Sequence, residues 1–332
     1  MTIDLTTHYG GLELVSPIVV GACPLTANEQ TRSVIESSGA GAIVLPSLFE
    51  EQVIRWCKRT GRTLSQRDRD LLKSAKRMGA DTANSNAEAY LSAVNRASTQ
   101  LSIPVIASLN GYAGSGWIDF AAELQEAGAR GIELNIHHPP PSEYDGPREV
   151  EDALVDTVRG VDAEITIPLF VKLGHDYTSM PHLARRLMSG VQGLVLHGRS
   201  PDVDICLDTL KLNRSWGLTQ PGSIAQSLAA IMRVHTYCPA IAIAATGGIA
   251  TADDVFRVLL AGADVAMVTS ALYREGPSAV RGLTDALLEF MERHEMRSVQ
   301  DLHHQRPIEF AKHEERVAYM AALSSARRRL SP

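Results

Sequence analysis

The sequence has few of the features that mark a membrane protein or a disulfide-stapled fold. Its cysteines number only four, are widely spaced and form no Cys-x-x-Cys pair, which argues against a zinc knuckle, a four-cysteine iron–sulfur cluster and a disulfide framework. This cysteine usage is typical of the reducing cytoplasm, where we expect the protein to act. There is no run of eighteen apolar residues and no signal-peptide pattern, so we expect no contact with a membrane.

Positive charge is not in excess either. The chain carries 32 Lys and Arg residues against 38 Asp and Glu residues, and no basic stripe runs along it, so nucleic acid is not an expected partner. The chain has 332 residues, 45% of them hydrophobic, and can therefore bury a large core. Because no low-complexity linker or charge block divides it, we predict a single domain over residues 1–332.

Short apolar runs alternate regularly with longer amphipathic segments. The runs are rich in Val, Ile, Ala and Leu, are bounded by Gly or Pro, and have the pattern of fully buried parallel strands: Ile18–Ala22, Ala42–Leu45, Pro104–Leu109, Gly131–Ile136, Pro168–Leu173, Gly193–Leu196, Ile241–Ala245 and Val265–Thr269. Helical patterns lie between them, the clearest at Trp117–Ala127, Val150–Val161, Met180–Met188, Ile224–Val234 and Ala252–Leu260. Eight strand–helix units in succession predict the α/β class and a closed (β/α)8 TIM barrel.

Three segments exceed this minimal barrel. Residues 3–15 predict a β-hairpin that turns at Gly10-Gly11 and plugs the N-terminal end of the barrel. Residues 47–84 form a long polar insertion after the second strand, where a barrel has its active-site face, so they are a candidate lid. Residues 297–330 predict one or two additional C-terminal helices.

The last two strands end in a pattern typical of phosphate binding. Thr246-Gly247-Gly248 follows the seventh strand, and Thr269-Ser270 follows the eighth. Barrel proteins build phosphate sites from these two loops, because glycine allows backbone N–H groups to approach the phosphate oxygens. The alternative is that the glycines serve only a tight turn. We predict a phosphate site, although the pattern alone does not indicate a flavin.

Polar side chains at other strand ends are candidates for chemistry. Lys172 ends a strand that is otherwise apolar, so it must point into the mouth or form a structural ion pair. Asn135 ends the fourth strand and can bond to the edge of a heterocycle. His137 and His138 follow it, and as neighbours on a strand only one of them could face the mouth. Cys23, at the end of the first strand, is read foremost as a small buried hydrophobe.

These motifs, in this order, resemble the dihydroorotate dehydrogenase family of FMN-dependent barrel enzymes. The resemblance extends from the N-terminal hairpin to about Pro277 and is carried by "SPIVVGAC", "GAIVLPS", "ELNIHHP", "VKL", "TGGI" and "TSALYREGP". The chain is most similar to the soluble branch of the family, and to a divergent subgroup within it. The resemblance implies a homodimer, a small-molecule substrate, and a soluble electron acceptor or a redox partner protein.

The resemblance also implies a role for each matching residue. Asn135 would contact the flavin ring or the substrate, Lys172 would lie by the N1–O2 edge of the ring, and His138 takes the position of the catalytic base. The implied FMN contacts are Ala22 and Cys23 under the ring, Ser47 after the second strand, Asn135, Lys172, and Gly247, Gly248, Thr269 and Ser270 at the phosphate. A cation near N1 would stabilise the anionic reduced flavin.

The departures from the family pattern concern the substrate. Leu45-Pro46-Ser47 stands where the family has Thr-Lys-Ser, residues 82–90 match its substrate loop poorly, and Pro140 replaces an Asn. A site that loses polar partners binds its ligand much more weakly. We therefore expect transfer of hydride from dihydroorotate or a related small cyclic substrate to FMN N5. The alternatives are a flavin-free phosphate-binding lyase or aldolase that uses Lys172 as a Schiff-base nucleophile, and a non-catalytic electron-transfer subunit.

Overall fold

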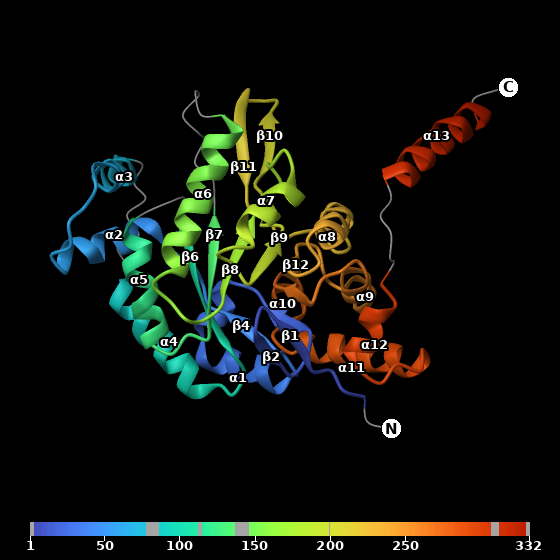
Figure 1. Ribbon diagram of the computed structural model, residues 1–332, viewed down its shortest axis with the longest axis horizontal. Coiled ribbons are helices and arrows are strands. Elements are labelled where there is room, and N and C mark those ends of the chain that lie inside the picture. The colour runs from blue at the N-terminus through green and yellow to red at the C-terminus, as the bar shows by residue number, and fades with distance from the viewer. Residues whose placement is uncertain are drawn as a thin grey trace.

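The computed structural model describes residues 3–77, 86–111, 115–136, 146–198, 200–306 and 312–329. Eight parallel strands form a closed barrel: β3 (Ile18–Val20), β4 (Ala42–Val44), β6 (Val105–Gly111), β7 (Gly131–Ile136), β8 (Leu169–Leu173), β9 (Gly193–Leu196), β12 (Ala242–Thr246) and β13 (Val265–Val268). Their order is β4-β3-β13-β12-β9-β8-β7-β6, and pairing of β4 with β6 closes the ring (Figure 1). The predicted α/β class and TIM barrel are confirmed, and the eight predicted strands end within two residues of the observed ones.

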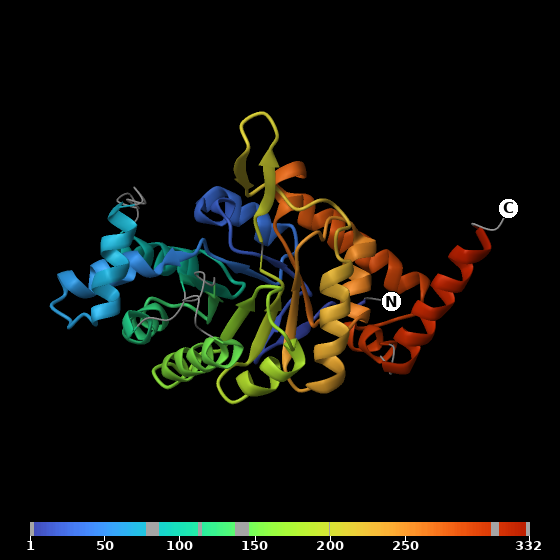
Figure 2. The same cartoon turned by 90° about the horizontal axis from the view of Figure 1, so that it is seen from above.

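Helices surround the barrel on its outside (Figures 1 and 2). They are α1 (Glu29–Ser37), α4 (Ala87–Gln100), α5 (Ser115–Glu126), α6 (Pro147–Asp162), α7 (Met180–Leu187), α8 (Ala225–Tyr237), α9 (Ala252–Leu260) and α11 (Ala279–Arg293), with the short η1 (Pro24–Ala27) and α10 (Ser270–Glu275) beside strand ends. The predicted start of α9 is confirmed, because Thr251 and Asp254 form a capping box. One face of this helix buries Val255, Val258 and Leu259 against the strands.

The predicted N-terminal hairpin is present and fills one end of the barrel. It consists of β1 (Thr7–Tyr9) and β2 (Leu12–Leu14), and Gly10 and Gly11 at its turn have positive φ angles of 53° and 91°. Tyr9 is fully buried and stacks on Phe170 of β8, with ring centroids 4.3 Å apart. A side chain at Gly10 would lie 2.5 Å from the Phe170 ring, so only glycine permits this close packing. The other end of the barrel stays open for a site.

Other segments extend the barrel. The insertion predicted over 47–84 contains β5 (Leu48–Phe49), α2 (Glu50–Arg59) and α3 (Gln66–Arg77), with 78–85 outside the described residues. A hairpin of β10 (Asp202–Cys206) and β11 (Lys211–Ser215), which the sequence did not suggest, extends from the end of the barrel opposite β1 and β2 (Figure 1). The expected C-terminal helices are α12 (Val299–His304) and α13 (Lys312–Arg329). Within the described ranges, no helix combines the length and apolar character needed to cross a membrane.

Candidate functional site

A cavity of about 1190 Å³ opens where the parallel strands end, at the carboxyl end of the barrel. We call it the mouth cavity. Its size suits a ligand as large as a nucleotide. Every residue that the sequence predicted as a cofactor contact borders it: Ala22, Cys23, Ser47, Asn135, Lys172, Gly247, Gly248, Thr269 and Ser270. The structure therefore brings together residues that are spread over 249 positions of the sequence, from 22 to 270.

The cationic side chain of the mouth cavity is held by a buried carboxylate. Lys172 on β8 is 8% exposed, and its Nζ lies 2.7 Å from Oε1 of Glu133 on β7, which is 1% exposed. Both readings of Lys172 from the sequence therefore apply, because it borders the cavity and also forms an ion pair. Asn135 lies two residues after Glu133 on the same strand face and pairs in register with Lys172 across the sheet.

Hydrogen bonds continue from this ion pair to the rim. Ser108 Oγ on β6 donates to Glu133 Oε1 at 3.3 Å, and it lies 2.8 Å from Ser47 Oγ, which borders the cavity. Tyr90 fixes Ser108, because its hydroxyl accepts from the Ser108 backbone N–H at 2.9 Å. Oε2 of Glu133 has no hydrogen-bond partner among the described residues. Glu133 was not predicted from the sequence as a site residue. Like Lys172, however, it is a charged residue in a strand that is otherwise largely apolar, and this signal could have indicated it.

The two predicted phosphate loops meet at one rim of the mouth cavity. Gly247 and Gly248 follow β12 with φ angles of 90° and 75°, which side chains rarely adopt. A Cβ at Gly247 would meet nothing within 4 Å and would project into open space, whereas a Cβ at Gly248 would lie 2.6 Å from Ser223 Oγ. Thr269 precedes α10, and its side chain makes no capping hydrogen bond to that helix. This rim thus offers backbone and hydroxyl groups around free space, as an oxyanion requires.

A third loop, which the sequence analysis missed, contributes to the same rim. Thr219 Oγ1 accepts a hydrogen bond from the Gly248 N–H at 3.2 Å and shares another with Ser270 Oγ at 2.7 Å. The carbonyl of Thr219 in turn accepts from Arg274 at 2.6 Å. Gly222 donates its N–H to the Gly248 carbonyl at 2.8 Å. These hydrogen bonds fix the geometry of the rim. The sequence signal that could have indicated this loop is the turn pattern "TQPGS" at Thr219–Ser223, before α8.

Two histidines that were not predicted also border the mouth cavity. His197 follows β9, is 6% exposed, and packs against His175 with ring centroids 4.1 Å apart. Burial, followed by the charge of His175, lowers the pKa of His197 to about 4, so its imidazole is neutral at pH 7. The predicted base His138, and His137 beside it, lie outside the described residues.

Cys23 fits its reading as a small buried residue. It is 5% exposed, and burial raises the pKa of its thiol above the ordinary value. A neutral thiol is a poor nucleophile, so Cys23 supplies shape to the floor of the mouth cavity rather than reactivity.

The fold and this site define the class of (β/α)8-barrel proteins that hold a ligand at the carboxyl end of the strands. Comparison with known families is more specific. The sequence model of the dihydroorotate dehydrogenase family matches residues 4–291, and the chain belongs to this family of oxidoreductases.

Individual relatives agree with this assignment. The chain is 30% identical to a "Putative dihydroorotate dehydrogenase A (fumarate)" of Aeropyrum pernix over an aligned region of 209 residues. This region covers 61% of this chain and 67% of the relative. It is 23% identical over 304 residues to a "Dihydroorotate dehydrogenase B (NAD(+)), catalytic subunit" of Thermoplasma acidophilum, and this alignment covers 90% of this chain and 97% of the relative. A "Dihydroorotate dehydrogenase A (fumarate)" of Limosilactobacillus reuteri is 29% identical over 210 residues, and this alignment covers 60% of this chain and 67% of the relative.

Proposed function

We propose that the protein is an FMN-dependent oxidoreductase of the dihydroorotate dehydrogenase type, with one FMN in the mouth cavity. The observation that carries the proposal is the convergence of all nine expected contact residues on one cavity of about 1190 Å³. The rim around Gly247 fits a phosphate, because a Cβ there would occupy the space that an oxyanion needs. When bound, FMN supplies a hydride acceptor that protein side chains lack.

The residues of the chain have separable roles in this proposal. The Gly247-Gly248 and Thr269-Ser270 loops bind the phosphate, and Ala22 and Cys23 form the surface on which a flat ring rests. Lys172 places a positive charge at the edge of that ring. Glu133 and Ser108 hold the ammonium group in place from below, at 2.7 Å through Glu133. A preorganised charge of this kind requires no reorganisation during the reaction.

The same ion pair argues against the lyase or aldolase alternative. A Schiff-base lysine must reach its neutral form to attack a carbonyl, and an apolar environment promotes this. The amine of Lys172 instead forms an ion pair at 2.7 Å with the carboxylate of Glu133, which is 1% exposed, so it is already held by a protein partner. No other observation favours that function.

For the substrate we propose dihydroorotate or a related small cyclic amide or acid, with His138 removing the proton. An imidazole suits this step near neutral pH. The names of the relatives include the small molecules fumarate and NAD(+), and for this chain we propose a soluble electron acceptor or a redox partner protein. Leu45-Pro46-Ser47, where the family has a lysine, supports a substrate range that differs from that of typical members.

The proposal is tested by an anaerobic visible spectrum of the purified protein, followed by addition of dihydroorotate. We expect a flavin band at roughly 450 nm that bleaches on addition of substrate. If the band persists with dihydroorotate but bleaches with another cyclic amide, the proposed flavin site would stand and that amide would replace dihydroorotate as the proposed substrate. The absence of a band after reconstitution with FMN would refute the proposal.

The role of His138 requires a separate comparison. The His138→Ala variant should slow flavin reduction by about 100-fold or more, whereas the matched His137→Ala variant should not. Equal reduction rates in the wild type and the His138→Ala variant would remove His138 from the mechanism.

A further inference from the structure

The hairpin of β10 and β11 carries a concentration of exposed apolar side chains. It projects beyond the barrel at the end opposite β1 and β2 (Figure 2). Seven large apolar residues within positions 203–218 are 40% to 84% exposed: Val203, Ile205, Leu207, Leu210, Leu212, Trp216 and Leu218. A cluster of this kind on a protein surface marks a contact site for another molecule.

The apolar residues of the two strands share one face of the hairpin. Ile205 pairs with Leu212, and Val203 lies two positions before Ile205, so these three side chains point to the same side. Asp204 and Asn213 form the pair between them and point to the other side. Both sides of the strands are exposed. We call the side that contains the following residues, the last two of which lie at the tip, the apolar hairpin face: Val203, Ile205, Leu212, Leu207 and Leu210.

The tip of the hairpin has apolar side chains where turns usually have polar residues or glycine. Leu207 is 84% exposed and Leu210 is 79% exposed. Leu210 also has a φ angle of 53°, which glycine and asparagine adopt with less strain than leucine. A leucine that is both strained and exposed contributes little packing within its own chain, and contact with another molecule explains its presence.

The position of the hairpin favours a permanent partner over a transient one. Asp202 begins β10 and Trp216 follows β11, and both residues border the mouth cavity. A two-stranded hairpin is marginally stable in water unless another surface covers it. A transient partner would leave this side of the mouth cavity unsupported between encounters. A second copy of the chain, in contrast, is always present, and homo-oligomers are the commonest assemblies of soluble proteins.

The exposed apolar area matches what a dimer needs. An interface of standard size buries about 800 Å² of each partner, of which roughly 450 Å² is non-polar. At about 100 Å² for a fully exposed large apolar side chain, the seven residues within positions 203–218 offer roughly 400 Å². Arg214, which pairs with Val203 at the base of the apolar hairpin face, gives this area a polar edge, as interfaces commonly have.

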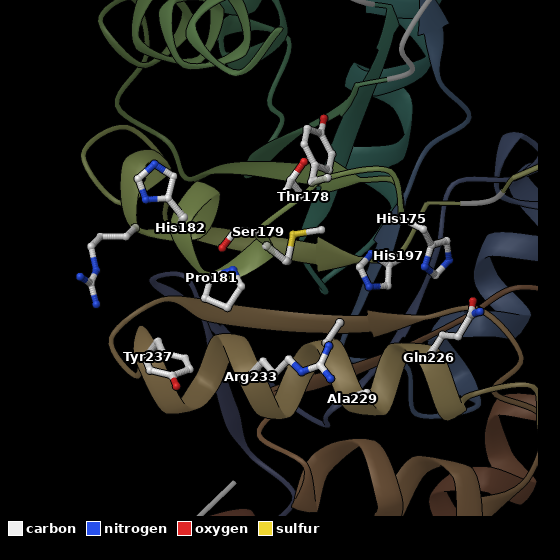
Figure 3. Close-up of a pocket in the computed structure, with 14 residues that line it drawn as sticks. His175, Thr178, Ser179, Pro181, His182, His197, Gln226, Ala229, Arg233 and Tyr237 are labelled. Atoms are coloured by element: carbon white, nitrogen blue, oxygen red, sulfur yellow. The ribbon is translucent and has the colours of Figure 1, made fainter. Parts of the chain in front are cut away.

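The surface of a second copy that best complements the apolar hairpin face is the same face. The pocket of about 730 Å³ between α7 and α8 is bordered mainly by polar side chains, among them Ser179, His182 and Gln226 (Figure 3). It therefore does not complement a row of leucine, isoleucine and valine side chains. Two apolar hairpin faces can instead pack on each other as two small sheets, and a two-fold axis between them closes the assembly at two copies.

We propose that the protein is a two-fold symmetric dimer in which the apolar hairpin face of each copy packs on that of the other. Val203, Ile205 and Leu212 form the centre of the contact, and Leu207 and Leu210 extend it along the tip. The polar side of each hairpin stays in solvent. The dimer contact also supports the side of the mouth cavity that the base of the hairpin borders.

The test is sedimentation velocity of the purified full-length protein over a dilution series. The variants are Ile205→Glu, Leu212→Glu and the milder Ile205→Thr, which keeps the branched shape of the side chain. Val15→Glu is the matched control, because Val15 is also a large apolar residue, is 62% exposed, and follows β2 at the opposite end of the barrel. Circular dichroism confirms that each variant is folded.

We expect the wild type to sediment as a dimer. Each Glu variant should raise the dissociation constant of the dimer by about 100-fold or more, because the two-fold axis places the new charge twice in an apolar contact. Ile205→Thr should raise it by about ten-fold, and Val15→Glu by less than about two-fold. A wild type that is monomeric at every concentration, a dimer that persists in both Glu variants, or equal weakening by Val15→Glu would overturn the proposal.

Discussion

Replacement of Glu133 by Gln should destabilise the barrel far more than loss of an ordinary ion pair. The substitution keeps the volume of the side chain but leaves the ammonium of Lys172, 8% exposed, without a countercharge. At 2.7 Å and an effective dielectric constant of about 20, the lost attraction is about 6 kcal/mol. The amide oxygen of the new Gln side chain can still accept a hydrogen bond from Lys172. We therefore expect the free energy of unfolding to fall by about 3 kcal/mol, the lower end of the range for breaking a buried ion pair.

The assay is thermal unfolding of the flavin-free protein, followed by circular dichroism. At about 2 °C per kcal/mol for a chain of this size, Glu133→Gln should lower Tm by about 6 °C. The control is Glu88→Gln. Glu88 pairs with Arg59 at the same 2.7 Å, but both side chains are about half exposed, so the loss should stay below about 1 kcal/mol. The double variant Glu133→Gln/Lys172→Met should recover stability. Equal Tm losses for Glu133→Gln and Glu88→Gln would refute the reasoning.

Three further predictions concern the two ends of the barrel. Gly247→Ala should weaken FMN binding strongly, because its Cβ would project into the open space proposed for the phosphate. Gly248→Ala should instead lower stability by about 1 kcal/mol or more, because its φ is positive and its Cβ would lie 2.6 Å from Ser223 Oγ; fluorescence titration and urea unfolding separate the two effects. His197 has a pKa of about 4 when folded and about 6.5 when unfolded, so its contribution to stability is complete above pH 6.5 and is lost as the pH falls toward 4. Between these pH values, urea unfolding should show that the free energy of unfolding falls by about 2 kcal/mol less in His197→Gln than in the wild type. Identical pH profiles for the two proteins would count against a buried neutral imidazole. Tyr9→Phe should leave stability unchanged or raise it by about 1 kcal/mol, since the Tyr9 hydroxyl has no hydrogen-bond partner among the described residues; a loss of 2 kcal/mol in urea unfolding would reveal a hidden partner.

The barrel could be predicted because its signal is local. A strand covered on both sides must be apolar along its whole length, as "GLVL" at Gly193–Leu196 is, and such runs are visible without any knowledge of their neighbours. The hairpin of β10 and β11 carries no such signal. Nearly all of its residues are exposed, so no burial pattern marks it as two strands.

The mouth cavity was predictable only in part. Lys172, Gly247 and Gly248 stand out as exceptions within their own segments. Thr219 does not, because its role arises from hydrogen bonds to two other loops that are distant in the sequence. His197 was missed for a similar reason, since only its packing against His175 and its burial distinguish it from an ordinary histidine at a strand end.

The central claim, one FMN with its phosphate at the rim of the mouth cavity, is tested most directly by comparing FMN with riboflavin. The two ligands share the ring and the ribityl chain and differ only in the phosphate. In equilibrium titrations followed by flavin fluorescence, we expect FMN to bind with a stoichiometry of one and at least about ten-fold more tightly than riboflavin. Equal affinities for the two flavins, or binding of neither, would contradict the account.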